Sequence, residues 1–350
     1  MRVGVVCNSF GRSGGMEKYA LNVVEALIRL GHHPVIFCKK EDQSLPFYDQ
    51  CEVHVCSSKW MPNKLHVVYF NRWLKNIRGT VPVEFAIGCC MGASSEIMVC
   101  GGTHIGYLKA MRRKPTFYDC WTINIEREQY QKCRFVVAHA KAMERELQQF
   151  YGLPADMIRV IYPPQTFKCL DAPMDKVALR KKYNLPQDKT LFLFPSMSHK
   201  RKGFALLKEY FTTTPYDECL IVVGKPIGGK YKNIQYLGFV NEMQEMYQAC
   251  DYSVLASFYD PLGTVGMESV WNGTPALIAE TIGSCECVDP EALRSFDAWS
   301  LDSFKKVMDE VRVVPMKITP PYQRYVHVPL DLTIDEHVKE LIELAKGFMK

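Results

Sequence analysis

The chain alternates short apolar strands with amphipathic helices, and it does so twice, on either side of a Pro163-Pro164 pair. The first repeat opens with an apolar strand over 2–7, a glycine-rich turn, a helix over about 16–30 and a strand over 34–38. Apolar residues recur close to every 3.6 positions in that helix. A strand, loop, helix, strand order implies a parallel sheet covered by helices. The sequence therefore predicts two open α/β domains.

The remaining elements follow the same alternation. Further strands are expected at 53–56, 67–70, 85–87, 135–138, 158–162, 190–194, 220–223, 234–237, 252–255, 275–279 and, as a weaker pattern, 287–288. Further helices are expected at about 140–151, 175–183, 203–212, 241–249, 301–312 and 333–349. Two prolines followed by a polar stretch are typical of a linker. We therefore divide the chain into domains at 1–165 and 166–325, with a closing helical segment over 326–350.

Composition narrows the class of protein. A chain of 350 residues, 47% of them hydrophobic, is long enough to bury two cores. No apolar run reaches the ~20 residues needed to cross a bilayer, and the first strand is too short for a secretory signal, so we expect a cytoplasmic protein. The 14 cysteines include no pair of C-x2-C knuckles, so we expect reduced thiols, with neither a metal nor a cofactor.

The most informative motif lies in the stretch 257–275, where Asp260 and Glu268 stand eight residues apart around Pro-Leu-Gly. Gly263 begins a run that can be helical, and the free N–H groups of residues 262–265 would then favour a phosphate. Carboxylates at either end of a phosphate site can accept hydrogen bonds from paired sugar hydroxyls. The motif thus has the parts of a nucleotide-sugar site. The alternative is an ordinary surface turn that feeds a core helix.

Two other loops carry groups that suit phosphate. Arg201 and Lys202 belong to a run of four basic or titratable side chains that follows a strand. An arginine binds phosphate oxygens in a fork, and a lysine adds a point charge. Gly14 and Gly15 precede the first helix, where the backbone can approach a ligand closely. A solvated charge run and a tight turn are the respective alternatives.

The spacing of Asp260 and Glu268 resembles the E-x7-E signature of retaining GT-B glycosyltransferases of family 4, with Asp260 in place of the usual first Glu. The resemblance implies a GT-B fold, in which two Rossmann-like parallel-sheet domains face each other across a cleft. It implies that the first domain, 1–165, binds the acceptor and the second, 166–325, binds the nucleotide sugar, and that the closing helix of 326–350 packs back on the first domain. It also implies that the first carboxylate meets the donor hexose and the second holds the ribose. The amides between them, here those of Gly263, Thr264 and Val265, would hold the diphosphate.

The same resemblance assigns roles to the other loops. Arg201 and Lys202 match the family's R-K-G stretch and would stabilise the departing diphosphate, and the Gly14-Gly15 turn would touch it. His104 follows a strand and two glycines, and would line the donor sugar pocket or meet the acceptor. A structural histidine bonded to the backbone is the alternative. Glu286 resembles the acid of a G-G-x-x-E loop near the phosphates or hexose, although a serine replaces the second glycine.

The implied function is transfer of a hexose from a nucleoside diphosphate sugar, with UDP as the default, to a saccharide or glycolipid acceptor with retention of configuration. The sequence lacks the D-x-D that metal-dependent GT-A sugar transferases use, so we expect catalysis without a metal. Asp260 is one methylene shorter than the usual Glu, about 1.5 Å. This difference bears on the choice of donor sugar.

A basic stretch lies beside Phe117, Tyr118 and Trp121, and its four cations are Lys109, Arg112, Arg113 and Lys114. Cations interleaved with aromatics suit an anionic membrane surface, here the inner face, or a phosphorylated lipid acceptor. The alternative is a solvated loop with some aromatics in the core. No nucleic-acid motif accompanies the patch, so we expect no nucleic-acid partner. Within the family, the stretch is most similar to that of the lipopolysaccharide core α-glucosyltransferases.

Two other functions remain open. A sugar-nucleotide epimerase shares the architecture but needs a set of acid–base carboxylates and histidines that the sequence does not display. A non-catalytic glycan-binding relative is the other alternative, left open by Asp260 and opposed by the intact Arg201, Lys202 and Glu268.

Overall fold

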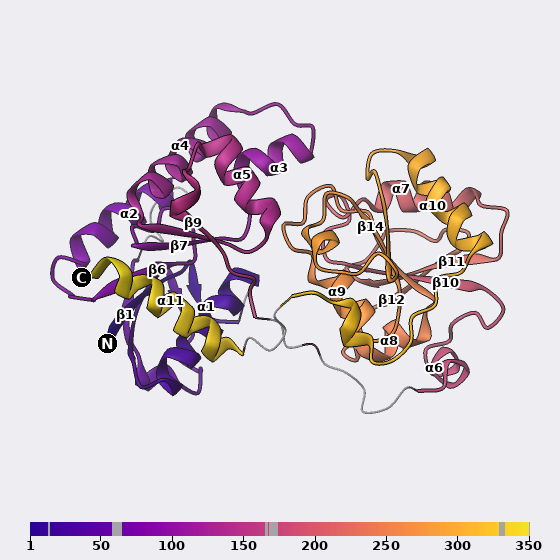
Figure 1. Cartoon of the computed structure of the whole chain (residues 1–350), viewed down its shortest axis with the longest axis horizontal. Helices are drawn as coiled ribbons and strands as arrows, with labels where there is room; N and C mark the ends of the chain where they lie inside the picture. Colours follow the sequence, from indigo (N-terminus) through magenta and orange to yellow (C-terminus); the bar gives the residue numbers. More distant parts are fainter. Residues whose placement is uncertain (13–14, 58–64, 165–166, 168–173, 329–332, 350) are drawn as a thin grey trace. The chain divides into compact units, whose positions relative to one another are not determined.

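The computed structural model describes residues 1–12, 15–57, 65–164, 167, 174–328 and 333–349 (Figure 1). The chain divides into two compact units. The first unit comprises Met1–Lys109, Arg113–Gln165 and Pro329–Lys350, and the second comprises Ala110–Arg112 and Thr166–Val328. Each unit holds one large parallel sheet with helices against it. The predicted fold class, two Rossmann-like α/β domains, is confirmed.

The first unit is built on a seven-stranded sheet in the order β5-β3-β1-β6-β7-β8-β9, and its neighbouring strands run parallel. Its strands are β1 (Arg2–Val6), β3 (His33–Cys38), β5 (Glu52–Val55), β6 (Phe85–Gly88), β7 (Ile97–Cys100), β8 (Phe135–Ala138) and β9 (Ile158–Val160). A separate pair joins β2 (Ser9–Phe10) to β4 (Lys40–Glu41). Its helices are α1 (Gly15–Arg29), α2 (His66–Ile77), α3 (His104–Ala110), α4 (Phe117–Lys132), α5 (Lys141–Tyr151) and α11 (Ile334–Met349).

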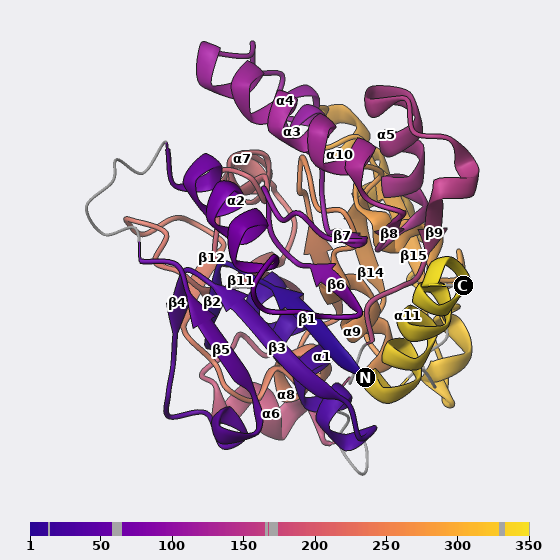
Figure 2. The same ribbon diagram turned by 90° about the vertical axis from the view of Figure 1, so that its left-hand side faces the viewer.

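Alternation along β3 directs its side chains to the two faces of the sheet. Ile36 and Cys38 join the apolar core that α1 and α11 cover. Phe37 points the other way, where its ring meets Trp73 of α2 at a centroid distance of 6.4 Å. Figure 2 shows α1 and α11 on one side of the sheet and α2 on the other. Every strand buried on both faces must be apolar throughout, which explains the runs that the sequence displays.

The second unit is built on a six-stranded parallel sheet in the order β12-β11-β10-β13-β14-β15. Its strands are β10 (Thr190–Ser196), β11 (Glu218–Gly224), β12 (Ile234–Gly238), β13 (Tyr252–Leu255), β14 (Ala276–Ala279) and β15 (Leu293–Phe296). Its helices are α6 (Lys176–Lys182), α7 (Phe204–Thr213), α8 (Met243–Ala249), α9 (Thr264–Trp271) and α10 (Leu301–Val313).

The central strand β10 again divides its side chains between two faces. Leu191 and Leu193 pack in a cluster with residues of α6 and α8. Phe192 lies on the opposite face, 5.4 Å from the ring of Phe211 on α7. Both faces of β10 therefore pack against apolar side chains.

Two sequence expectations and one of the alternatives are corrected. Residues 67–70, predicted as a strand, lie in helix α2, because the apolar pair Phe70 and Leu74 lies four residues apart on one buried helix face. Residues 287–288 form only an isolated bridge at Val288, and the edge strand β15 comes later. The stretch before Trp121 is not a loop throughout, because helix α4 starts directly after Thr116.

Helix α11, at the end of the chain, packs along α1 of the first unit. Tyr19 Oη lies 2.7 Å from His337 Nε2, and both residues are buried. Arg29 of α1 pairs with Asp335 of α11 at 2.5 Å. The ring of His139 lies 5.0 Å from that of Tyr19. A polar cluster of two histidines and a tyrosine thus sits inside an otherwise apolar interface between the two helices and the sheet.

Burial lowers the pKa of His337 from 6.5 to about 4, an effect partly opposed by the Tyr162 backbone, and burial lowers the pKa of His139 to about 3. The unfolded chain therefore binds more protons than the folded chain below pH 6.5. The stability that the two neutral histidines contribute is fully present above pH 6.5, and it is lost as the pH falls toward 4. For His337 alone the loss at pH 5 is about 2 kcal/mol.

We expect hydrogen exchange of the α1 and α11 amides, corrected for the intrinsic rate, to accelerate between pH 7 and pH 5. In His337→Gln this pH dependence should become shallower, whereas the exposed His33→Gln should keep the slope of the parent protein. Equal slopes in the parent chain and His337→Gln would contradict the assignment.

The loop after β10 approaches the loop after β13 closely at Gly203. Gly203 has a left-handed φ of 71° and caps α7. A Cβ atom there would overlap the carbonyl oxygen of Ala256. Beside this contact, the Phe258 N–H donates to the Arg201 carbonyl at 2.9 Å. The absence of a side chain at Gly203 therefore allows the two loops to join.

Gly203→Ala should lower the free energy of unfolding by at least about 2 kcal/mol more than Gly228→Ala. Gly228 is a matched control, because its φ of 63° carries the same backbone strain while its Cβ position is open. Urea unfolding followed by circular dichroism measures both variants. An equal loss in the two would show that the close approach contributes nothing.

Candidate functional site

The joined loops of the second unit bring together three of the predicted catalytic residues. Arg201 Nη1 lies 3.7 Å and Lys202 Nζ 4.0 Å from Asp260 Oδ2. Arg201 Nη1 also donates to the Tyr259 carbonyl oxygen at 2.6 Å, which fixes the guanidinium. Residues 58 or more positions apart in sequence thus form one cluster. Both distances to Asp260 are long for a salt bridge, and two cations share one carboxylate. The positive charge of Arg201 and Lys202 is therefore only partly neutralised.

Lys202 is the most deeply placed of these charges. Its side chain is 13% exposed, and its ammonium donates weakly to the Pro195 carbonyl oxygen at 3.5 Å. Burial lowers the pKa of Lys202, while Asp260 and Glu268 act in the opposite direction. A buried ammonium with long contacts gains by meeting an anion, because the anion restores the charged form. The cluster is therefore suited to phosphate.

The N-terminus of α9 lies beside the cluster. Gly263 precedes the helix with a left-handed φ of 65°, and no side chain caps the N–H groups of the first turn. A Cβ on Gly263 would lie 3.5 Å from Asp260 Cγ, which places this turn next to the carboxylate. The amides of Thr264 and Val265 belong to this uncapped turn. Unpaired N–H groups at a helix start favour an anion.

Glu268 lies one turn further along α9. Its carboxylate accepts hydrogen bonds from Tyr247 Oη at 3.0 Å and from Thr264 Oγ1 at 3.3 Å. Burial, and next Glu268, raise the pKa of Tyr247, so the phenol stays protonated as a donor. Tyr247 comes from α8 and was not identified from the sequence. In the sequence, a single tyrosine on an amphipathic helix cannot be distinguished from an ordinary core residue, so Tyr247 carries no clear sign of a role in the site.

Glu286 ends a short 3-10 helix, Gly283–Glu286, that follows β14. This segment lies against the Asp260 loop, because the Gly283 N–H donates to the Asp260 carbonyl oxygen at 3.1 Å. Ser284 is fully buried, and its hydroxyl has no hydrogen-bond partner among the described residues. A Cβ on Gly266 would come within 3.1 Å of that oxygen, so the hydroxyl lies at the first turns of α9.

The other predicted residues belong to the first unit. Gly14 lies outside the described residues, and Gly15 starts α1 with open space at its Cβ position. His104 starts α3, and its Nε2 lies 2.8 Å from Asp119 Oδ1. Arg113 meets the same oxygen at 2.5 Å. The imidazole is therefore held by a carboxylate, rather than by the backbone contact considered for a structural histidine.

Glu126 extends this network, and no sequence motif singles it out. Its carboxylate accepts one hydrogen bond from the backbone N–H of His104, at 3.0 Å, and another from the Tyr151 hydroxyl. Burial raises the pKa of Glu126. Together with Gly101 and Gly102, Glu126 lines a cavity of about 290 Å³ beside the ends of β6 and β7. A small pocket with a perturbed carboxyl group thus lies at the predicted His104 loop.

The predicted cation patch is partly occupied by intramolecular contacts. Lys109 Nζ lies 4.1 Å above the Phe150 ring, and Arg113 pairs with Asp119. Lys114 is exposed beside Phe117, whose side chain is 91% exposed. Within the described ranges, no helix is long and apolar enough to cross a membrane. Nor does that part of the chain hold three His, Cys, Asp or Glu side chains grouped for a metal ion.

Two glycosyltransferase family models match successive parts of the chain. The model of Glycosyltransferase Family 4 matches residues 13–164, and the model of Glycosyl transferases group 1 matches residues 175–301. A protein of Burkholderia thailandensis named "Probable transglycosylase" is 35% identical over 352 residues, which cover 99% of this chain and 97% of that protein.

Solved structures agree in fold. WaaG, a glycosyltransferase involved in lipopolysaccharide biosynthesis, has a TM-score of 0.76 at 16% identity, over 99% of this chain and 100% of its own. HepE from Anabaena, in complex with UDP and glucose, has a TM-score of 0.70 at 15% identity, over 97% and 99%. Both family models and the full-length relative lead to the same assignment: this chain belongs to the GT-B glycosyltransferases of family 4.

Proposed function

We propose that this glycosyltransferase moves a hexose from a nucleoside diphosphate sugar, with UDP as the nucleotide, to a saccharide acceptor with retention of configuration. The observation that carries the proposal is the cluster of Arg201, Lys202 and Asp260 beside the uncapped start of α9. That cluster offers two cations and free amides to a diphosphate and a carboxylate to the sugar. HepE, which has the same fold, binds UDP and glucose, and this supports the choice of donor.

In the proposed reaction the bond from the anomeric carbon to the diphosphate breaks first. Arg201, Lys202 and the amides of Gly263, Thr264 and Val265 stabilise the charge that develops on the leaving diphosphate. The acceptor hydroxyl attacks the same face, and a donor phosphate oxygen takes its proton. Glycosidic bond cleavage is thereby balanced by bond formation to the acceptor, with no covalent enzyme intermediate. Fixed cations fill the electrostatic role that a metal ion would otherwise have.

The two carboxylates of the motif have separate tasks in this proposal. Asp260 orients the donor hexose, and Arg201 and Lys202 lie 3.7 and 4.0 Å from its carboxylate oxygen. Glu268 accepts hydrogen bonds from the ribose hydroxyls, and Tyr247 holds it in place. Glu286 and the Gly14-Gly15 turn are assigned to the phosphates or hexose, and His104 to the donor sugar or the acceptor.

The proposed acceptor is a cell-surface glycan core such as that of lipopolysaccharide. Its support is WaaG, which shares the fold and is involved in lipopolysaccharide biosynthesis. We also propose contact with an anionic membrane at the cytoplasmic face through the stretch of Lys109, Arg112, Arg113 and Lys114. Its support is the exposure of Lys114 and of the Phe117 ring beside it. An exposed aromatic next to cations favours an interface between water and lipid.

Replacing both cations, Arg201→Ala with Lys202→Ala, should lower kcat for UDP-sugar turnover at least about a hundredfold, because the leaving charge loses its stabilisation. UDP release from a panel of nucleotide sugars, with and without an oligosaccharide acceptor, gives the measurement. Lys200→Ala is the matched control, since Lys200 is exposed in the same loop. Unchanged turnover in the double variant would rule out the proposed site.

Asp260→Asn should lower turnover with every donor, while Asp260→Glu should change the ranking of donor sugars, because the carboxylate advances by about 1.5 Å. Ratios of kcat/KM across donors that differ at single hydroxyls measure this effect. If Asp260→Glu shifts all donors by one common factor, then Asp260 does not contact the hexose.

The name of the Burkholderia relative favours one competing activity, transglycosylation from a glycan donor. Such an enzyme would transfer sugar between oligosaccharides without nucleotide release, so product analysis in the absence of nucleotide sugar separates the two. The same incubations separate an epimerase, which would convert the donor without releasing nucleotide, from a non-catalytic relative, which would bind without turnover.

A further inference from the structure

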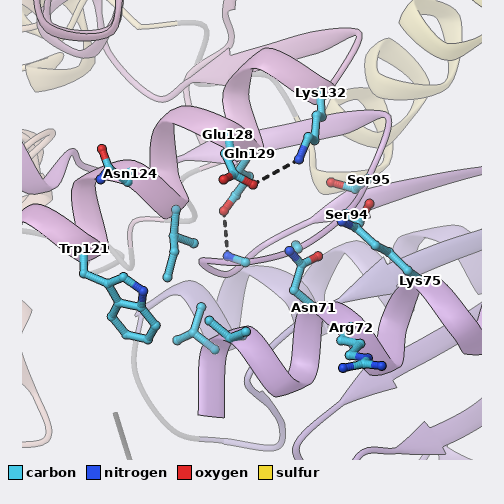
Figure 3. A pocket seen from close by; sticks show the side chains of 15 residues that line it. Asn71, Arg72, Lys75, Ser94, Ser95, Trp121, Asn124, Glu128, Gln129 and Lys132 are labelled. Carbon is cyan, nitrogen blue, oxygen red and sulfur yellow. Dashed lines mark hydrogen bonds and ion pairs between the residues drawn. The ribbon is translucent and has the colours of Figure 1, made fainter. Parts of the chain in front are cut away.

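A groove of about 480 Å³ lies in the first unit between α2 and α4, over the crossover of residues 92–95 (Figure 3). None of the predicted site residues line it. It shares only Gln129 with the cavity beside β6 and β7, among the residues that line each. Gln129 is fixed there, because its Oε1 accepts the Gly92 N–H at 2.6 Å. This hydrogen bond joins α4 to the crossover at the floor of the groove.

One end of the groove is apolar and contains an aromatic ring. The indole of Trp121 lies there (Figure 3), and the apolar lining also includes Ile125 of α4 and Val67 and Val68 of α2. Trp121 is partly exposed, with the Tyr118 ring 5.7 Å away, and a sugar that packed on its remaining surface would gain dispersion and burial. Asn124, also on α4, adds an exposed amide beside the ring.

The other end of the groove is positive. Lys132 pairs with Glu128 at 3.0 Å, so these two charges offset each other. Arg72 and Lys75 of α2 also line the groove and are exposed, and neither forms a salt bridge within 4 Å with any described residue. Lys132 has the largest part in lowering the pKa of the Glu128 carboxyl group, and Lys75 lies near enough to lower it further. Two cations on one helix, three residues apart, thus present charge to a single ligand group.

A buried acceptor lies between the two ends. Asn71 Oδ1 is inaccessible to solvent and has no hydrogen-bond partner among the described residues. In Figure 3 the Asn71 side chain points toward the crossover and Gln129. A buried amide oxygen without a donor costs about 1–3 kcal/mol. Because this oxygen is covered, the Asn71 side chain must rotate toward the groove before a ligand hydroxyl can donate to it and remove that penalty.

We propose that this groove binds an anionic saccharide, with a sugar ring on Trp121, a hydroxyl at Asn71 and a phosphate or carboxylate group between Arg72 and Lys75. The inference rests on the proposed transfer to a saccharide and assigns its acceptor a negative charge. The ring, the amide and the cation pair each match a different part of such a molecule. No bond forms or breaks in the groove, which positions the acceptor and leaves the chemistry to the donor site.

Isothermal titration calorimetry of the full chain tests the proposal with three probes: a neutral trisaccharide and the same trisaccharide carrying one phosphate monoester or one carboxylate. We expect at least one charged probe to bind about tenfold or more tightly than the neutral probe. Arg72→Gln with Lys75→Gln should lower the affinity for that charged probe to the affinity for the neutral probe. Trp121→Leu should lower the affinity for all three probes. The two charged arms identify which anion the groove takes.

Two matched variants separate the groove from general charge and from folding. Lys40→Gln with Lys339→Gln removes two exposed cations of the same unit that do not line the groove, and it should bind as the parent does. Arg72→Lys with Lys75→Arg keeps the charges and should retain binding. Equal affinity for neutral and charged probes, or a loss as large in the Lys40 and Lys339 variant, would overturn the proposal.

Donor turnover distinguishes this inference from the proposed function. In the Arg72 and Lys75 variant, UDP-sugar hydrolysis without acceptor should be unchanged, while KM for the charged acceptor rises about tenfold at constant kcat. If the parent releases no nucleotide but still binds the charged probe through the groove, then the proposed function fails and the binding site stands. If the parent releases nucleotide but binds the neutral and charged probes equally well, then the groove proposal fails and the proposed function stands.

Discussion

The arrangement of the second unit depends on the contact between the loop after β10 and the loop after β13. These two strands are neighbours in the sheet but lie about 60 residues apart in the chain. The left-handed Gly203 allows the backbones to touch, and the Arg201 carbonyl and guanidinium both bond the partner loop. These contacts bring Arg201, Lys202 and Asp260 together within 4 Å. The positive cluster is preorganised, which is what stabilisation of a developing charge requires.

The first unit organises its polar groups differently. Asp119 and Glu126 lie on one helix and reach two atoms of His104, the imidazole Nε2 and the backbone N–H. The contact with Asp119 orients the imidazole ring, and the contact with Glu126 holds the backbone that carries it. Burial raises the pKa of Glu126, whereas hydrogen bonds from Thr116, first from its side chain and then from its backbone, lower the pKa of Asp119. Two carboxyl groups on α4 thus have opposite shifts within one network.

The sequence predicts the fold well where strands are buried on both faces, because an apolar run bounded by turns has one reading there. It fails at α2, where Val67, Val68 and Phe70 imitate a strand and only the later Leu74 shows the helical period. The start of α4 could have been found, since Thr116 and Asp119 form a capping box, three residues apart. Tyr247 and Glu126 could not, because their partners come from distant elements. The motif around Asp260 was recognisable since its spacing is local.

The position of α11 has a consequence for synthesis of the chain. The second unit consists almost entirely of one continuous segment, Thr166–Val328, so its core is complete as soon as that segment leaves the ribosome. The first unit begins earlier but must wait for its last helix, since Val338, Leu341 and Ala345 finish the core over α1. Until then an apolar face of the nascent protein stays open to solvent, and chaperones that recognise such surfaces have their longest opportunity there.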